Sequence, residues 1–204
     1  MKIETFVNQV AEENTYLLTF ANGHQLLIDP GSDEKYLANL SQPQAVLLTH
    51  AHFDHIWGLK SIKEAFPNIQ IWLAESERNW LSDPVLNCSR LMLGFDLTTV
   101  EATNFYDFSK TLEFADCEIT VRPTPGHSIG SVTLVFEQEK SIFSGDALFK
   151  NSIGRTDLPT GNFDQLIHSI KKEILTIPND FQVFPGHGPM TTIAEEKQFN
   201  PFLS

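Results

Sequence analysis

The sequence predicts an α/β (or α+β) protein in which several short strands end in residues of metal-binding type. Short β-prone runs such as residues 15–20 and 45–48 recur along the chain. Segments with apolar residues at helical spacing, such as residues 56–66, separate them. Four of the strands are followed by histidine or aspartate. Because open α/β folds bind ligands beyond the carboxyl ends of their strands, these endings predict one functional site.

The first half begins with a β-hairpin, because Asn22-Gly23 supplies the positive φ angles of a tight turn. Pro67 stops a helix that follows the fourth strand. Strands are expected over residues 3–7, 15–20, 25–28, 45–48 and 69–74, and helices over 32–40, 56–66 and 75–81. Residues 82–110 show no regular pattern, which predicts either a substrate lid or a surface excursion.

The second half repeats one arrangement, a β-prone run followed by glycine and then a potential ligand. The runs at residues 118–122, 141–144 and 181–184 precede His127, Asp146 and His187, respectively. A further strand is expected over residues 132–137, and helices over 162–175 and 191–200. No linker or change in composition interrupts the chain, so a single domain over residues 1–204 is expected.

Composition and charge exclude several classes of partner. The net charge of −12 disfavours nucleic acid and anionic membrane surfaces. No apolar run approaches the roughly 20 residues that span a bilayer. The sequence shows no secretory signal, and its two cysteines form no CxxC pair, which favours a reducing cytoplasm.

The segment 49–55, Thr-His-Ala-His-Phe-Asp-His, is the strongest candidate for a metal site. It follows the apolar run 45–48 and holds nitrogen and oxygen ligands that zinc, iron or manganese accept. The alternative, a solvated histidine-rich loop or tag, is disfavoured because the cluster is internal and also contains an aspartate. The strand ends together offer seven ligands: His50, His52, Asp54, His55, His127, Asp146 and His187.

Seven ligands exceed what one tetrahedral zinc with an open position needs, so two divalent ions sharing a bridging group are expected. Such ions polarise a carbonyl or phosphoryl oxygen and lower the pKa of bound water toward neutrality. The chain has no Gly-x-Ser-x-Gly motif, and neither cysteine is next to a histidine. The residues therefore predict a metal-dependent hydrolase whose nucleophile is metal-bound hydroxide.

The ordered set His50-x-His52-x-Asp54-His55, His127, Asp146 and His187 resembles the metallo-β-lactamase fold superfamily. The resemblance implies a four-layer αββα sandwich with two metals, most simply zinc, although iron or manganese is compatible. It assigns His50, His52 and His127 to one metal, and Asp54, His55 and His187 to the other. Asp146 would bridge them, and Asp54 and Asp146 are the expected catalytic carboxylates. Asp29 resembles a supporting aspartate behind a ligand histidine, unless Asp29-Pro30-Gly31 simply forms a turn.

Within the superfamily the sequence is most similar to short glyoxalase II-like enzymes, through residues 145–149 and 152–159. This implies hydrolysis of small-molecule thioesters such as S-D-lactoylglutathione. Arg155 would bind a substrate carboxylate, or else would pair with Asp157. Two departures bear on the thiol carrier: the chain ends soon after His187, and Asp157 stands where a substrate-binding tyrosine is usual.

The main alternative function is that of a persulfide dioxygenase. It would use one iron held by His50, His127 and Asp146, and that group resembles this chain through the Gly-Arg-Thr-Asp sequence at 154–157. A lactonase or a non-enzymatic metal-binding domain is a further alternative. The sequence leaves the oligomeric state open.

Overall fold

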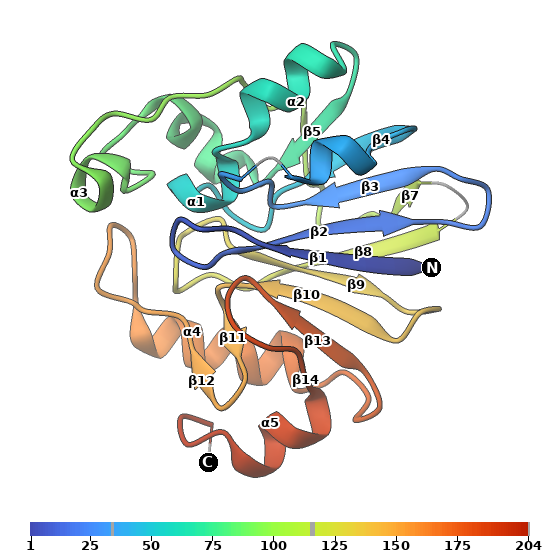
Figure 1. The fold of residues 1–204 in the computed structure, drawn as a ribbon. Coiled ribbons are helices and arrows are strands. Elements are labelled where there is room, and N and C mark those ends of the chain that lie inside the picture. Colours follow the sequence, from blue (N-terminus) through green and yellow to red (C-terminus); the bar gives the residue numbers. More distant parts are fainter. Residues whose placement is uncertain (34, 115–116, 204) are drawn as a thin grey trace. The chain divides into compact units, whose positions relative to one another are not determined.

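The computed structural model describes residues 1–33, 35–114 and 117–203. The chain divides into two compact units, residues 1–106 and 107–204, which we call the first and second unit (Figure 1). Each unit contains its own six-stranded sheet. The single domain expected over residues 1–204 stays a prediction.

The sheet of the first unit has its strands in sequence order, and they change from antiparallel to parallel at the third. Its strands are β1 Lys2–Val7, β2 Asn14–Thr19, β3 Gln25–Ile28, β4 Pro43–Leu47, β5 Gln70–Leu73 and β6 Asn104–Phe105. The first three pair antiparallel, and β3 to β6 pair parallel. The carboxyl ends of β3, β4 and β5 therefore lie at one edge of this sheet, where Asp29, Thr49 and Ala74 follow them.

Helical segments cover one face of the first sheet. They are η1 Lys35–Asn39, α1 Phe53–Ile56, α2 Leu59–Ala65 and η2 Glu75–Ser82. A further helix, α3 Ser89–Leu93, contributes no residue to the core cluster described for this sheet. Strand residues Leu27, Val46 and Ile71 pack in one core cluster with Leu59 of α2 and Trp80 of η2. This burial of an apolar helix stripe against alternate strand residues stabilises the unit.

The sheet of the second unit is mostly antiparallel. Its strands are β7 Leu112–Phe114, β8 Cys117–Pro123, β9 Val132–Phe136, β10 Ser141–Gly145, β13 Gln182–Pro185 and β14 Thr191–Thr192, in the order β14-β13-β10-β9-β8-β7. Only the pairing of β10 with β13 is parallel among the pairs described for this sheet. Asp146 and His187 follow these two strands and therefore leave the sheet at the same edge.

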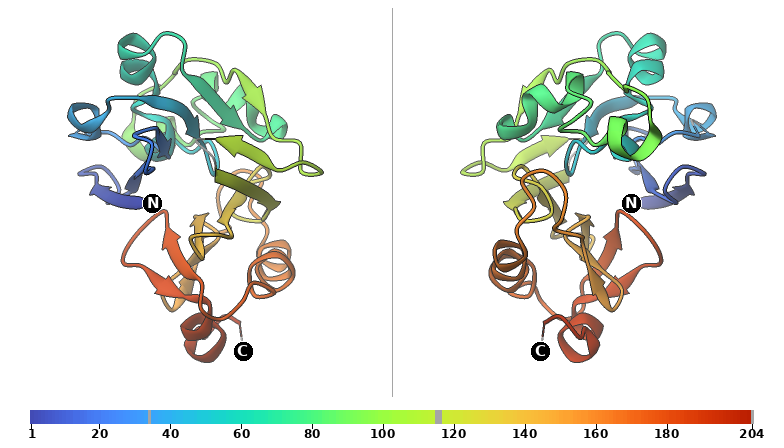
Figure 2. Two further views of the ribbon diagram at one scale, coloured as in Figure 1. Left: turned by 90° about the vertical axis from the view of Figure 1, so that its right-hand side faces the viewer. Right: turned by 90° about the vertical axis from the view of Figure 1, so that its left-hand side faces the viewer.

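Two helical segments and a small hairpin complete the second unit. They are α4 Phe163–Ser169, which continues into the π-helical turn η3 Ile170–Ile174, α5 Ile193–Phe199, and the hairpin of β11 Leu148–Phe149 with β12 Ser152–Ile153. Figure 2 shows α4 beside the strands of this sheet. Leu166 and Ile170 pack there on Ile142 and Val183.

Both sheets are apolar on their second face as well. In the first unit, Leu18 and Leu26 are fully buried although they lie outside the cluster that the helices cover. In the second unit, Phe143 packs on Phe136 and Phe184, with ring centroids 5.4 and 5.2 Å apart. Strands that bury both faces are typical of the inner layers of an α/β fold.

The structure changes several sequence expectations. The helix expected over 56–66 is interrupted between α1 and α2, where the backbone N–H of Gly58 donates to the carbonyl of Pro30. A side chain at Gly58 would collide with Tyr36 and Gly31. Asp54 and His55 consequently lie inside α1. Over residues 32–40, only the short η1 is helical among the described residues. The expectation of irregular chain over 82–110 is wrong in part, because α3 and β6 lie there.

None of the described helices is long and apolar enough to span a bilayer. The helix expected over 162–175 is found as α4 and η3, and the hairpin β11–β12 was not expected.

The N-terminal cap of α4 offers a test of how the second unit is held together. The side chain of Asn162 accepts a hydrogen bond from the backbone N–H of Gln165. The backbone N–H of Asn162 donates to the carbonyl of Gly126, the residue before His127. Asn162→Ala should lower the free energy of unfolding by about 1 kcal/mol, measured by urea denaturation. Gln165→Ala, an exposed change in the same turn, should alter it by no more than about 0.5 kcal/mol. Equal effects of the two substitutions would contradict the capping role.

Candidate metal centre

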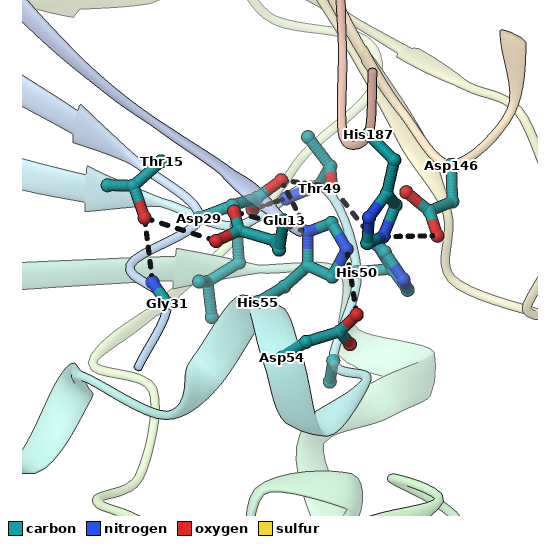
Figure 3. Close-up of polar contacts among 12 residues, drawn as sticks. Glu13, Thr15, Asp29, Gly31, Thr49, His50, Asp54, His55, Asp146 and His187 are labelled. Carbon is teal, nitrogen blue, oxygen red and sulfur yellow. Dashed lines mark hydrogen bonds and ion pairs between the residues drawn. The ribbon is translucent and has the colours of Figure 1, made fainter. Parts of the chain in front are cut away.

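The first unit brings four predicted ligands together behind β4. The chain leaves the sheet at Thr49 and enters α1 at Phe53, so that His50, His52, Asp54 and His55 all lie within seven residues and are buried. The ring centroids of His50 lie 4.8 Å from His52 and 4.2 Å from His55. The Nε2 atom of His55 is 4.0 Å from a carboxylate oxygen of Asp54 (Figure 3). These distances allow neighbouring ligand atoms to share a metal ion.

Asp29 lies directly behind this loop. It adopts a φ of 48° after the end of β3, and its carboxylate accepts hydrogen bonds from the backbone N–H and the hydroxyl of Thr49, at 2.7 and 2.6 Å. One of its oxygens is also 3.1 Å from Nδ1 of His55 (Figure 3). Asp29 is therefore both a turn residue and a contact of a predicted ligand.

The Thr49 hydroxyl indicates which ring nitrogen of His50 carries the proton. Since this hydroxyl donates to Asp29, it accepts from Nδ1 of His50, 3.1 Å away. A proton on Nδ1 puts the lone pair of His50 on Nε2. His55 has the same arrangement with Asp29 at its Nδ1. Metal-binding histidines usually donate their other ring N–H to such an oxygen, which fixes the ring and raises its basicity.

A second buried carboxylate, Glu13, approaches His55 and was not expected from the sequence. It accepts hydrogen bonds from Asn8 at 2.6 Å and Thr15 at 3.2 Å, and its other oxygen is 4.0 Å from Nδ1 of His55. A side chain at Gly31 would collide with Glu13, so the glycine of Asp-Pro-Gly is needed for this packing (Figure 3). Gly31 is the one feature of the sequence that could have pointed to this packing around Glu13.

The second unit places two predicted ligands, His127 and His187, beside the third, Asp146. One carboxylate oxygen of Asp146 is 3.5 Å from Nε2 of His127 and 3.4 Å from Nε2 of His187. Figure 3 shows the contact with His187. All three side chains come from loops that follow strands β8, β10 and β13, as the sequence predicted.

The loop after the hairpin β11–β12 fixes His127 by its backbone. The carbonyl oxygen of Arg155 lies 2.8 Å from Nδ1 of His127 and accepts its proton. A side chain at Gly154 would collide with the carbonyl of Asp146 and press on His127. A histidine with Nδ1 bound in this way would hold a metal through Nε2, as in the first unit. The donor sets of both units thus fit divalent metal ions.

Arg155 forms the ion pair that the sequence left open as an alternative. Its guanidinium binds Asp157 through two hydrogen bonds of 2.7 and 2.8 Å. These bonds lower the pKa of the Asp157 carboxyl to about 2. Both side chains are largely exposed, so the pair is a weak one that a second carboxylate could replace.

Hydrogen bonds join the two ends of the segment 82–97 and tie it to neighbouring helices. Asn87 donates to the carbonyls of Trp80 and Leu97, both at 3.0 Å, and its carbonyl accepts from Phe53 of α1. Arg90 binds Asp96 through two bonds of 2.8 Å. The segment is thus tied to the helix that carries Asp54 and His55. Its role as a lid stays a prediction.

Gly154 provides a test of the close packing behind His127 and Asp146. Gly154→Ala should lower the free energy of unfolding by about 3 kcal/mol in a urea titration, because the added Cβ meets backbone that must move. Gly94→Ala is the control, since Gly94 has a φ of 75° but open space around its Cα. It should cost about 1 kcal/mol, from backbone strain alone. A cost at Gly154 no larger than at Gly94 would contradict this packing.

Comparison with known proteins places this geometry in a family. Residues 10–187 match the metallo-beta-lactamase superfamily. A probable metallo-hydrolase of Streptococcus pyogenes is 44% identical, with 100% of this chain and 90% of that protein covered. The probable metallo-hydrolase YqgX of Bacillus subtilis is 37% identical, with 95% and 93% covered. The hydroxyacylglutathione hydrolase GloC of Haemophilus influenzae is 29% identical, with 100% and 99% covered.

Solved structures agree with the sequence relatives. The BLEG-1 B3 metallo-beta-lactamase is 39% identical and superposes with a TM-score of 0.95 over 100% of both chains. The protein TTHA1623, solved in a di-iron-bound form, is 32% identical, with a TM-score of 0.84 over 98% of this chain and 100% of that one. The predicted fold class is thereby confirmed, and the chain belongs to the metallo-β-lactamase superfamily.

Proposed function

We propose that this protein is a metal-dependent hydrolase that cleaves small-molecule thioesters such as S-D-lactoylglutathione. The proposal rests on the hydrogen bonds that hold the rings of the predicted ligand histidines. His50, His55 and His127 each have Nδ1 bound to a protein oxygen, at 3.1, 3.1 and 2.8 Å. Rings held in this way in both units are pre-organised to bind metal through Nε2.

The ligand roles follow the order of the superfamily motif. His50, His52 and His127 would hold one ion, and Asp54, His55 and His187 the other. Asp146 would bridge the two, in keeping with its nearly equal distances of 3.5 and 3.4 Å from His127 and His187. The cofactors of the proposal are two divalent ions. We propose zinc, although TTHA1623, a relative, was solved with two irons.

Three carboxylates, Asp29, Asp54 and Asp146, have roles in this proposal. Bound divalent ions would supply Lewis acidity and a water of lowered pKa. Asp54 and Asp146 offer the carboxylate oxygens that orient this water and receive its proton. Asp29 keeps His55 and the Thr49 backbone in place, so that the ligands need little reorganisation when substrate arrives.

The thioester class rests on two lines of support. GloC, a hydroxyacylglutathione hydrolase, matches the whole chain, and two probable metallo-hydrolases match it with higher identity. Arg155 also presents a guanidinium whose shape suits a carboxylate, as its bidentate pair with Asp157 demonstrates. A cytoplasmic location belongs to the proposal and agrees with two buried cysteine thiols, Cys88 and Cys117.

Metal analysis combined with a thioester panel tests the function. Freshly purified protein should contain about two metal ions per chain and release free thiol from S-D-lactoylglutathione or from other low-molecular-weight thiol carriers. Asp146→Ala should lose at least one of the two ions and more than 99% of the turnover, because the bridging carboxylate is removed. His168→Ala, at an exposed position of α4, is the control and should keep both.

Three outcomes would each contradict a part of this proposal. One iron per chain with oxygen consumption on glutathione persulfide would instead identify a persulfide dioxygenase. Full turnover in Asp146→Ala would exclude the bridging role. Lactone hydrolysis without thioester hydrolysis would keep the metal centre but change the substrate class.

The pair of Arg155 with Asp157 yields opposite effects for two substitutions. Arg155→Ala should raise KM for glutathione thioesters by about tenfold with a smaller change in kcat, because a remote carboxylate contact acts on ground and transition states alike. Asp157→Asn should lower KM, because it removes the negative charge that competes with the substrate carboxylate for the guanidinium. Steady-state kinetics on both variants give the measurement. An unchanged KM in each would leave Arg155 with a structural role only.

A further inference from the structure

Glu77 is a fully buried glutamate that the proposed function does not use. It lies in the first turn of η2, behind β5, and has no exposed surface. Glu75, two residues earlier in the same helix, is exposed and pairs with Arg78. Burying a carboxylate costs several kcal/mol unless hydrogen bonds compensate it, so a buried glutamate beside an exposed one calls for a specific partner.

Glu77 binds the backbone of residues 49–53, which we call the ligand loop because it carries His50 and His52. One carboxylate oxygen accepts a hydrogen bond of 2.7 Å from the N–H of Ala51, the residue between His50 and His52. A charged acceptor makes such a bond shorter and stronger than a neutral one. The bond fixes the peptide that sets the spacing of the two histidines.

Three amides of the loop beyond β4, residues 49–53, bind side-chain or loop acceptors and not a strand. The N–H of Thr49 donates to Asp29, that of Ala51 to Glu77, and that of Phe53 to the carbonyl of Asn87. These amides belong to alternate residues, and His52, between the last two, has an extended backbone conformation with φ −72° and ψ 152°. The amides of Ala51 and Phe53 belong to the peptide groups that directly follow His50 and His52, so these two bonds restrict the backbone that sets the direction of the two side chains.

The same helix contacts His52 a second time. The ring of Trp80, one turn after Glu77, lies 5.6 Å from the His52 ring, with 34° between the planes. The position of η2 follows from the topology: β4 and β5 are adjacent and parallel, so the segments after them leave at one edge. Glu77 and Trp80 thus hold the backbone and a ring of the same loop.

We propose that Glu77 is a positioning residue for the metal centre. Its carboxylate fixes the Ala51 amide, and this keeps His50 and His52 at the separation that one ion requires before the ion arrives. The inference rests on the proposed role of these histidines as metal ligands, and it does not depend on which substrate is cleaved.

Zinc binding to the metal-free protein tests the proposal. Protein stripped with a chelator is titrated with Zn²⁺ against a chromophoric competitor, and the exchange of the Ala51 amide is followed by NMR in the metal-free state. Glu77→Gln keeps the size of the side chain and an acceptor oxygen but removes the charge. It should weaken the tighter zinc site by about tenfold and speed exchange at Ala51, while the Thr49 amide, held by Asp29, stays slow.

Glu75→Gln is the matched control and should leave both measurements unchanged, since Glu75 is exposed on the same helix. Zinc affinity within twofold of the parent protein, or unchanged Ala51 exchange in Glu77→Gln, would overturn the positioning role. A Glu77→Gln chain that does not fold, by circular dichroism, would overturn it in favour of a general structural role. Failure of the parent protein itself to bind zinc or another divalent ion would instead refute the proposed metal centre, and the Ala51 exchange would still report on Glu77.

Discussion

Carboxylates buried at one edge of the first sheet hold the ligand loop in place. Asp29 and Glu77 follow β3 and β5, on either side of β4, whose end carries His50 and His52. Each accepts a backbone N–H of that loop at 2.7 Å. Uncompensated charges of this kind would destabilise the fold, and here the loop amides compensate them. The loop and the carboxylates therefore depend on each other, and the parallel topology is what brings them together.

In the second unit a backbone carbonyl, and not a carboxylate, binds Nδ1 of the histidine. His127 is held by the carbonyl of Arg155, and the room for that contact comes from Gly154, which has no side chain to strike Asp146. Gly126 similarly packs on the backbone of α4 at Leu166. In the second unit the predicted ligands are held by close contacts between backbone segments. In the first unit they are held by hydrogen bonds to buried carboxylates. The first arrangement is sensitive to a change of charge, and the second to a single added methyl group.

The sequence predicted most of the strands and all of the loops that carry candidate ligands, because these signals are local. A β-prone run that ends in glycine and histidine can be read from a few neighbouring residues, as at 181–187. Glu13 and Glu77 could not be found in this way. Their contacts join residues 42 and 26 positions apart, at His55 and Ala51, and nothing near them in the sequence distinguishes Glu77 from the exposed Glu75. The hairpin β11–β12 was missed because two-residue strands have no periodicity to detect.

The hairpin that precedes Arg155 is held in place by α5 and the residue that follows it, Asn200. Glu196 of α5 is fully buried and accepts from the backbone N–H of Asn151, at the tip of the hairpin, and from Thr191 and Asn200. Asn200 in turn donates to the carbonyl of Ser152. The hairpin is thereby fixed at its turn by α5 and at its end by the contact of Gly154 with Asp146. Because Arg155 is the next residue, α5 helps to fix the backbone position of Arg155, although α5 supplies no predicted ligand itself.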